Sequence, residues 1–236
     1  MDSYERAWRH ANEHAAGRPL TVEMVLSVAA QAVDADGFGM TLVSGPGLRE
    51  LAAASGRVAT LIEETQLTSG EGPCSDAYSR LAPVLVPDLN AAADRWPGFV
   101  PAMAPTGVAA VFAFPLQTFG IRVGALDLYR YRPGPLSKAQ FTDATAFADV
   151  TAQVAFCHHA ALRALPPLGD DEPPHGFPPG VHQAAGVLAA QLAMPVTDAL
   201  LRLRAYAYLH DEPLTAIAGR VVERRLTLAP HHDPDR

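Results

Sequence analysis

The sequence predicts an α+β domain with an antiparallel sheet, followed by an all-α bundle of three helices. Short apolar runs interrupted by glycine and proline, within residues 38–55 and 108–130, are typical of β-hairpins. Longer segments with apolar residues at helical spacing precede, separate and follow these runs. A proline- and acid-rich stretch over residues 165–178 then divides the chain, and three short helical patterns follow it within residues 179–228.

Helical patterns begin the N-terminal domain. Residues 20–36 place apolar side chains on one helical face between Thr21, a candidate N-cap, and Gly37, which ends the pattern. Residues 4–16 are a second candidate helix, and Gly-Arg-Pro at residues 17–19 would separate the two. Both helices precede the expected sheet.

The expected sheet consists of two hairpins and one short strand. Pro115 predicts that its strand is an edge strand or carries a bulge, because proline cannot donate a backbone hydrogen bond. A helix over residues 58–67 and a glycine turn that opens a short helix near Ser75 lie between the hairpins. In chain order the expected strands are residues 38–44, 49–55, 84–86, 108–117 and 121–130, and residues 90–106 are loop or short helix.

A long helix closes the first domain, which we expect to span residues 1–164. Ser137 and Gln140 have the spacing of a capping box, and apolar residues continue at helical spacing to about residue 164. Residues 165–178 predict a linker of limited flexibility. The C-terminal domain would then occupy residues 179–228, and residues 229–236 are expected to be disordered.

Composition predicts a globular, cytoplasmic protein. Hydrophobic residues make up 49% of the 236 residues and charged residues 18%, which is enough for two packed cores. The chain has neither an apolar run of membrane-spanning length nor an N-terminal signal segment. Cys74 and Cys157 lie far apart and outside any CxxC pattern, which fits a reducing compartment. The sequence indicates no metal and no cofactor.

The formal net charge of -7 is unevenly distributed. Residues 1–178 contain 12 basic and 19 acidic residues, whereas residues 179–236 contain 6 of each. General nucleic-acid binders need a broad basic surface, because phosphate neutralisation dominates their affinity. Any nucleic-acid contact by this chain is therefore expected to be local.

Two segments of the first domain resemble the GAF domain. GEGPCSDAY at residues 70–78 is similar to the corresponding segment of GAF domains that precede ANTAR modules, and VGALDLY at residues 123–129 is similar to the late-strand GAF signature. The order of expected helices and strands over residues 20–160 agrees with that family. The resemblance implies a sensory domain.

GAF domains can bind small molecules between the sheet and the covering helices, and the resemblance implies a similar pocket for an unknown ligand. The residues that would line such a pocket would equally fill a solid core. They are Met40, Leu42, Phe112 and Leu126.

The C-terminal segment resembles the ANTAR domain, an RNA-binding module of bacterial transcription antiterminators. The resemblance rests on Gln-Ala-Ala-Gly at residues 183–186, Asp-Ala at 198–199, Leu-Arg at 203–204 and Ile-Ala at 217–218. Many ANTAR domains carry lysine between the alanine and the glycine of the first motif, where this chain has Ala185. The residues expected to contact RNA are Ala184, Ala185, Gly186, Arg204, Arg220 and Arg224.

Arg220 and Arg224 also have a simpler interpretation. They lie four positions apart on one predicted helix face and can serve only to solvate it, with Glu223 as a nearby partner. Arg204 has stronger support for RNA contact, since the family motif specifies arginine at that position.

The leading hypothesis is a bacterial GAF and ANTAR domain-containing antitermination regulator that is not an enzyme. It would bind stem-loops in nascent RNA and act as a homodimer through the apolar helix after Ser137. One alternative is a thiol-dependent sulfoxide reductase with Cys74 as the thiol and Cys157 as its redox partner. The other is a DNA-binding C-terminal bundle, which the neutral charge of that segment disfavours.

Overall fold

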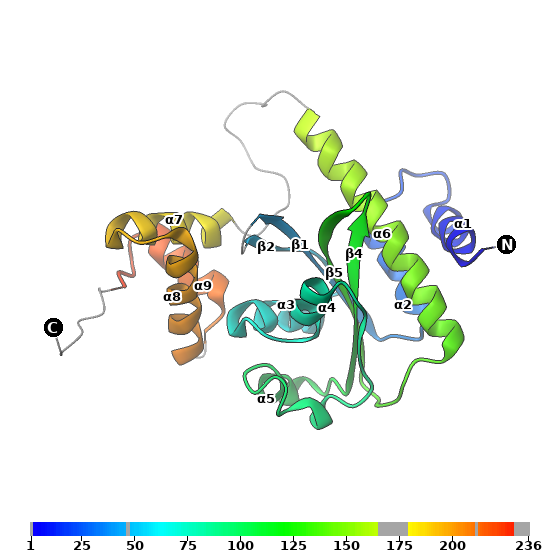
Figure 1. Cartoon of the computed structure of the whole chain (residues 1–236), viewed down its shortest axis with the longest axis horizontal. Helices are drawn as coiled ribbons and strands as arrows, with labels where there is room; N and C mark the ends of the chain where they lie inside the picture. Colours follow the sequence, from blue (N-terminus) through cyan, green and yellow to red (C-terminus); the bar gives the residue numbers. More distant parts are fainter. Residues whose placement is uncertain (1, 46–47, 165–178, 211, 229–236) are drawn as a thin grey trace.

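Residues 2–45, 48–164, 179–210 and 212–228 are described by the computed structural model. They form an α+β domain and, on one side of it, three C-terminal helices (Figure 1). The expected linker and C-terminal tail lie outside the described residues. In the part of the chain that is described, no helix has both the length and the apolar character needed to cross a membrane.

A five-stranded antiparallel sheet forms the centre of the α+β domain, as the hairpin patterns predict. The strand order is β2-β1-β5-β4-β3, and β5 joins the two hairpins by pairing with both β1 and β4. The strands are β1 Gly37–Gly45, β2 Leu48–Ala54, β3 Val84–Val86, β4 Ala110–Thr118 and β5 Ile121–Arg130.

Pro115 lies in β4, an inner strand, at a point where the sheet tolerates proline. β3 is short and pairs only with residues 111–113 of β4, so that Pro115 lies beyond its end. A register shift follows between Leu116 and Gln117. Proline has no N–H to donate, and the sheet accommodates it here because Pro115 has no β3 partner and lies next to an irregularity in the pairing with β5.

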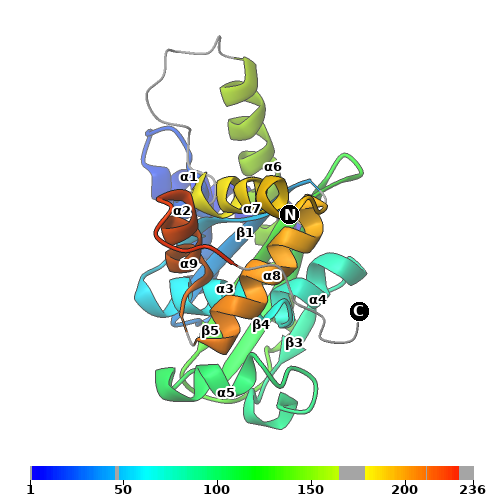
Figure 2. The same ribbon diagram turned by 90° about the vertical axis from the view of Figure 1, so that its left-hand side faces the viewer.

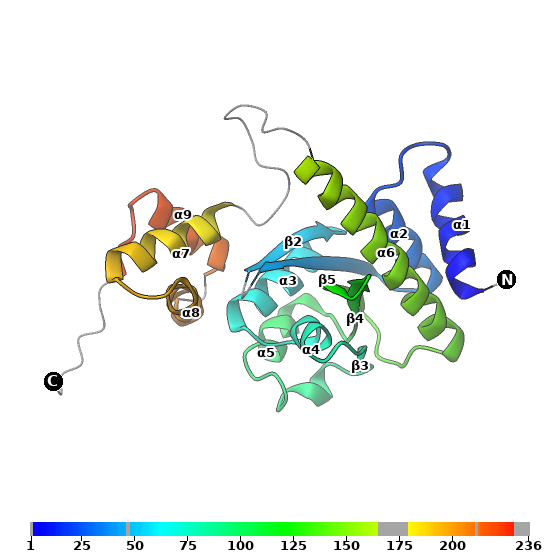
Figure 3. The same cartoon turned by 45° about the horizontal axis from the view of Figure 1, so that its top comes forward.

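Two helices, α2 Val22–Ala32 and α6 Lys138–Ala164, cover one face of the sheet, and α1 Ser3–Ala15 packs against both (Figures 1 and 3). Thr21 caps α2 by accepting a hydrogen bond from the Met24 N–H at 3.3 Å. The predicted capping box begins α6: the Ser137 N–H donates to Gln140 Oε1 at 3.0 Å, and the Gln140 N–H donates to Ser137 Oγ at 3.2 Å. The dimer contact expected along α6 stays a prediction.

The opposite face of the sheet is covered by α3 Arg57–Ser69, α4 Pro73–Arg80 and the segment after β3 (Figure 1). That segment contains α5 Val100–Met103 and two 3-10 helices, Asn90–Ala92 and Ala104–Thr106, in agreement with the loop or short helix expected there. Trp96, Phe99 and Met103 fill the core on this side.

The three expected C-terminal helices are present as α7 Pro179–Leu192, α8 Val196–Leu209 and α9 Leu214–Val222. Leu188, Leu203 and Ile217 are fully buried in their shared core. Leu67 from the C-terminal turn of α3 is part of the same core. Helices α8 and α9 therefore pack against α3, and Figures 1 and 2 show them next to it.

Candidate functional site

A cluster of acidic side chains lies buried between the sheet and the two helices α3 and α4. Glu63 on α3, Cys74 on α4 and Asp127 on β5 are only 4%, 4% and 1% exposed. A carboxylate oxygen from each acid and the Cys74 sulfur all lie within 4.8 Å of one another. We call these three residues the carboxylate–thiol cluster.

Local structure explains why the three groups meet. Successive side chains of a strand point to opposite faces, so Leu126 and Leu128 enter the core beneath α2 and α6, while Asp127 faces α3 and α4. Helical spacing places Glu63 on the buried side of α3. Gly39 on β1 leaves the space that the Glu63 carboxylate occupies, because a Cβ at this position would collide with it.

Hydrogen bonds satisfy only half of the carboxylate oxygens. Thr41 Oγ1 donates to Glu63 Oε2 at 2.7 Å, and Gln66 Nε2 donates to Asp127 Oδ2 at 2.5 Å. Gln66 Oε1 accepts from the Cys74 N–H at 2.8 Å, which links α3 to the first turn of α4. Among the described residues, Glu63 Oε1 and Asp127 Oδ1 have no hydrogen-bond partner.

Burial of three acidic groups together disfavours their ionisation. Desolvation raises the pKa of Asp127 to about 7. Desolvation and the neighbouring Asp127 charge raise the pKa of Glu63 well above its ordinary value. Burial and both carboxylates likewise raise the pKa of the Cys74 thiol, against the opposing charge of Arg49. In the absence of a bound cation, the cluster is therefore expected to retain at least one proton near neutral pH.

Comparison with known proteins identifies the α+β domain. Residues 19–156, more than half of the chain, match the family model of the GAF domain. The chain belongs to the GAF domain family. This confirms the resemblance over residues 20–160, whereas the C-terminal helices lie beyond the matched residues. No curated protein matches this chain.

One solved GAF domain shares the fold, and two further solved structures are similar at lower TM-scores. The GAF domain of a phosphoenolpyruvate-protein phosphotransferase from Coxiella burnetii is 18% identical with a TM-score of 0.52, covering 69% of this chain and 98% of its own. A domain of a putative two-component sensor histidine kinase protein from Sinorhizobium meliloti 1021 is 20% identical with a TM-score of 0.45, covering 60% and 92%. The type II free methionine-R-sulfoxide reductase from Thermoplasma acidophilum is 19% identical with a TM-score of 0.44, covering 66% and 96%. At these identities the likeness concerns the fold alone.

The surroundings of Cys74 do not activate a thiol. Reactive cysteines are partly exposed and lie near positive charge, which favours the thiolate. Cys74 is instead buried beside two carboxyl groups, and its pKa is raised. Cys157 is exposed on α6, on the other side of the GAF sheet from α4. The sulfoxide reductase alternative therefore gains no support from the two cysteines.

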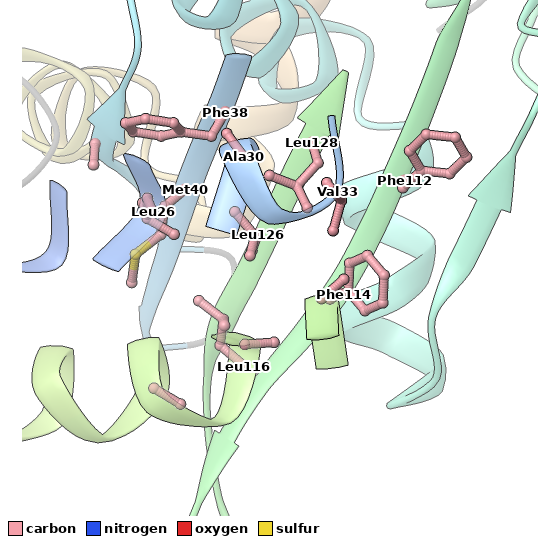
Figure 4. Packing of buried hydrophobic residues seen from close by; sticks show 14 of the residues in the cluster. Leu26, Ala30, Val33, Phe38, Met40, Phe112, Phe114, Leu116, Leu126 and Leu128 are labelled. Atoms are coloured by element: carbon pink, nitrogen blue, oxygen red, sulfur yellow. The ribbon is translucent and has the colours of Figure 1, made fainter. Parts of the chain in front are cut away.

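The four residues expected to line a ligand pocket belong to the GAF domain's packed core. Met40, Phe112 and Leu126 are 0% exposed beneath α2 and α6 (Figure 4). Leu42 is partly buried and packs against the same cluster. They fill the solid core that the sequence left open as the alternative. Because side chains alternate along the strands, the carboxylate–thiol cluster lies on the other face of the same sheet.

Two of the residues expected to contact RNA have buried side chains. Ala184 and Ala185 are 0% and 1% exposed in the core of the C-terminal helices, so neither side chain offers a surface to a ligand. Helical spacing directs both alanines toward α8 and α9. Gly186 is exposed, and a Cβ added there would meet no other atom within 4 Å.

Arg204 on α8 faces the GAF domain. It lines a cavity of about 520 Å³ between the domain and α8, together with Glu71, Gly98 and Tyr208. Burial and the Arg49 charge lower the pKa of Arg204. Its Nε has no hydrogen-bond partner among the described residues. The arginine that the family motif specifies therefore lies at the contact between the two parts of the chain.

The remaining two arginines do not share a helix face as expected. Arg220 forms an ion pair with Glu212 at 2.9 Å. Arg224 lies beyond the end of α9 at Val222, where its φ of 56° takes the backbone out of the helix. It is exposed, and the adjacent Arg225 pairs with Glu223.

Sequence reasoning missed Glu63, Gln66 and Asp127 as site residues. One available signal was Asp127 itself, a charged residue within the apolar run of a buried strand. A second was the presence of Glu63 and Gln66 at helical spacing with Ile62 on the buried side of α3. The contact between Gln66 of α3 and Asp127 of β5 carries no signal in the sequence.

Proposed function

We propose that this protein is a signal-responsive transcription antitermination regulator, in which the GAF domain controls an RNA-binding bundle of the ANTAR type. The observation that carries the proposal is the position of Arg204. The motif arginine of the C-terminal helices lies against the GAF domain, so that contact between the two parts can govern its access to RNA.

The C-terminal helices support RNA binding through a small number of positions. Gly186 is exposed with open space beside it, which lets a nucleic-acid loop approach the backbone of α7. Ala184 and Ala185 contribute by permitting close packing of α7 against its neighbours. Arginine suits RNA loops because its planar guanidinium pairs with phosphates and stacks on unpaired bases. Arg204 and the exposed Arg224 would make these contacts.

The contact between the GAF domain and the bundle supports a regulatory role. Leu67 of α3 is buried in the core of the C-terminal helices, and Thr215 Oγ1 donates to Glu64 Oε1 of α3 at 3.5 Å. Arg204 is half-buried in this arrangement, and phosphate contact requires an accessible guanidinium. The docked arrangement would thus be the state with weak RNA binding, and undocking would expose the arginine.

Helix α3 provides a physical connection for the signal. It carries Glu63 of the carboxylate–thiol cluster and Gln66, which hydrogen-bonds that cluster. It also carries Glu64 and Leu67, which contact the C-terminal helices. A ligand or partner that shifts α3 would change both sets of contacts. Such coupling requires only that the signal binds one position of α3 better than the other.

The test is binding of the purified full-length protein to an RNA with two adjacent hexaloop stem-loops, over a series of salt concentrations. Arg204→Ala should weaken binding by about 10-fold, the effect of losing one good arginine contact. Leu67→Asp should strengthen binding because it undocks the bundle. Arg57→Ala, which removes an exposed arginine at the start of α3, is the matched control and should leave affinity unchanged.

Equal affinity for this RNA and for a scrambled hairpin would contradict the RNA-binding proposal. Tighter binding to duplex DNA than to either RNA would instead favour the DNA-binding alternative. If Leu67→Asp left the affinity of the paired stem-loop RNA unchanged, RNA binding would stand, but control of Arg204 by docking would not.

A further inference from the structure

Two unpartnered oxygens in the carboxylate–thiol cluster require an explanation. Among the described residues, no other side chain or backbone group donates a hydrogen bond to Glu63 Oε1 or Asp127 Oδ1, and the two carboxyl groups can hydrogen-bond each other only while one of them keeps its proton. Buried acidic groups in native proteins are normally paired, hydrogen-bonded or bound to a metal ion. Here the third member of the cluster is a cysteine, whose sulfur is itself a metal ligand when deprotonated.

We propose that Glu63, Cys74 and Asp127 bind one divalent first-row transition-metal ion of the zinc or iron(II) class. A thiolate is a soft ligand, and together with two carboxylates it favours these ions over magnesium and calcium, which prefer oxygen ligands alone. The three residues come from α3, α4 and β5, so the ion would join the helical cover to the sheet.

The spacing of the ligand atoms is close to that of a metal site. Zinc bonds of about 2.0–2.3 Å to oxygen and sulfur place tetrahedral ligand atoms about 3.5 Å apart. The atoms of the cluster lie within 4.8 Å of one another. Side-chain movements of about 1 Å would therefore close the site around an ion, and a fourth position would be available to another ligand.

The charge of the surroundings supports a dication. The ionised cluster would carry three negative charges, and a divalent ion would leave one uncompensated. Arg49 on β2 lowers the pKa values of both Glu63 and Cys74, and it hydrogen-bonds Ser75 beside the cysteine. The ion and this guanidinium together would neutralise the buried site.

Neighbouring residues hold the proposed ligands in place. Thr41 donates to Glu63 Oε2 and Gln66 donates to Asp127 Oδ2, leaving the unpartnered oxygen of each acid for the ion. Hydrogen bonds of this kind orient metal ligands and fix which oxygen coordinates. The competing occupant of the same space is a proton shared between the two carboxyl groups. Binding experiments distinguish the metal ion from the proton.

The experiment uses the full-length protein, stripped of metal by a chelator and titrated with Co²⁺ under reducing conditions. Wild type should bind one Co²⁺ per chain, with the near-ultraviolet charge-transfer absorption that marks a cobalt–thiolate bond. Cys74→Ser should abolish this absorption, while Cys157→Ser, at the exposed cysteine, should retain it. Zn²⁺ should displace Co²⁺ and raise the Tm of the wild type.

Conservative variants separate ligation from folding. Glu63→Gln and Asp127→Asn keep the shape of each side chain, and each should weaken Co²⁺ binding by at least about 10-fold while the circular dichroism spectrum stays that of the wild type. Absence of stoichiometric Co²⁺ binding would overturn the metal site and leave the shared proton. A charge-transfer band that survives in Cys74→Ser but is lost in Cys157→Ser would also overturn it.

Discussion

Glu63 and Leu67 lie one turn apart on α3, but Glu63 is buried in the carboxylate–thiol cluster and Leu67 in the core of the C-terminal helices. The Glu63 carboxyl accepts from Thr41 within the GAF domain, whereas the Leu67 side chain packs among the C-terminal helices. A displacement of α3 would therefore disturb both the Thr41–Glu63 hydrogen bond and the packing of Leu67.

Leu67→Asp should separate the C-terminal helices from the GAF domain. Leu67 is 7% exposed in the docked arrangement, and burying an aspartate there without a partner would cost more than exposing it to water. Small-angle X-ray scattering should show a larger radius of gyration, with the circular dichroism spectrum of folded protein. Leu85→Asp, at a 42% exposed leucine on β3, is the control. Unchanged dimensions in Leu67→Asp would argue against this docking.

Stability of the metal-free protein should fall as pH rises, because Asp127 has a raised pKa. Its pKa is 3.8 when unperturbed and about 7 in the fold, where Glu63, Cys74 and Arg49 are the neighbouring titratable groups. Stabilisation by the protonated form is fully present below the unfolded pKa and is lost as pH approaches the folded pKa. The loss should be on the order of a few kcal/mol.

Urea unfolding of chelator-treated protein at about pH 5 and about pH 8 measures this loss. Asp127→Asn cannot ionise at that position, so its stability should change less between the two pH values. An equal decline in both proteins would assign the pH dependence to other groups.

Gly39→Ala should destabilise the GAF domain because the new methyl group would occupy the space of the Glu63 carboxylate. Overpacking of this kind costs about 1–3 kcal/mol. Glu63→Ala removes the obstructing group, so the double variant should lose less stability than the two single changes added together. Urea unfolding of the four proteins gives this coupling directly, and simple additivity would show that the two residues do not compete for space.

Leu126→Ala distinguishes a packed core from a ligand pocket. Leu126 is 0% exposed between the sheet and α2 and α6, so its truncation should leave a cavity and cost about 2–5 kcal/mol. Leu85→Ala, at an exposed leucine, should cost much less. Chemical denaturation measures both, and a Leu126→Ala protein as stable as the Leu85→Ala control would mean that the site is not tightly packed.

Local chemistry made much of the fold predictable. Thr21 and the Ser137–Gln140 pair lie where helices begin because they supply hydrogen bonds to backbone groups that would otherwise be unpaired. Pro115 signalled a local edge because it lacks a donor, and the hairpin strands follow from turns in the sequence. These are interactions between residues close in the chain, which a sequence pattern records.

The face of each strand residue was harder to assign. The sequence predicted that Met40, Phe112 and Leu126 lie inside the domain. Whether they line a ligand pocket or fill a solid core depended on how tightly α2 and α6 pack over them. Ala184 and Ala185 were recognised as motif residues, but the motif does not say which of its positions face the bundle core. Packing of distant elements decided both.

The sequence by itself determined the succession of helices and strands and the three C-terminal helices, because turn, capping and periodicity signals are local, while the GAF family followed from the resemblance of two motifs. Only the tertiary structure brought Glu63, Cys74 and Asp127 together and turned Arg204 toward α3. Those residues are separated by many positions in the chain. Their proximity depends on how the sheet and helices pack, which no local pattern encodes.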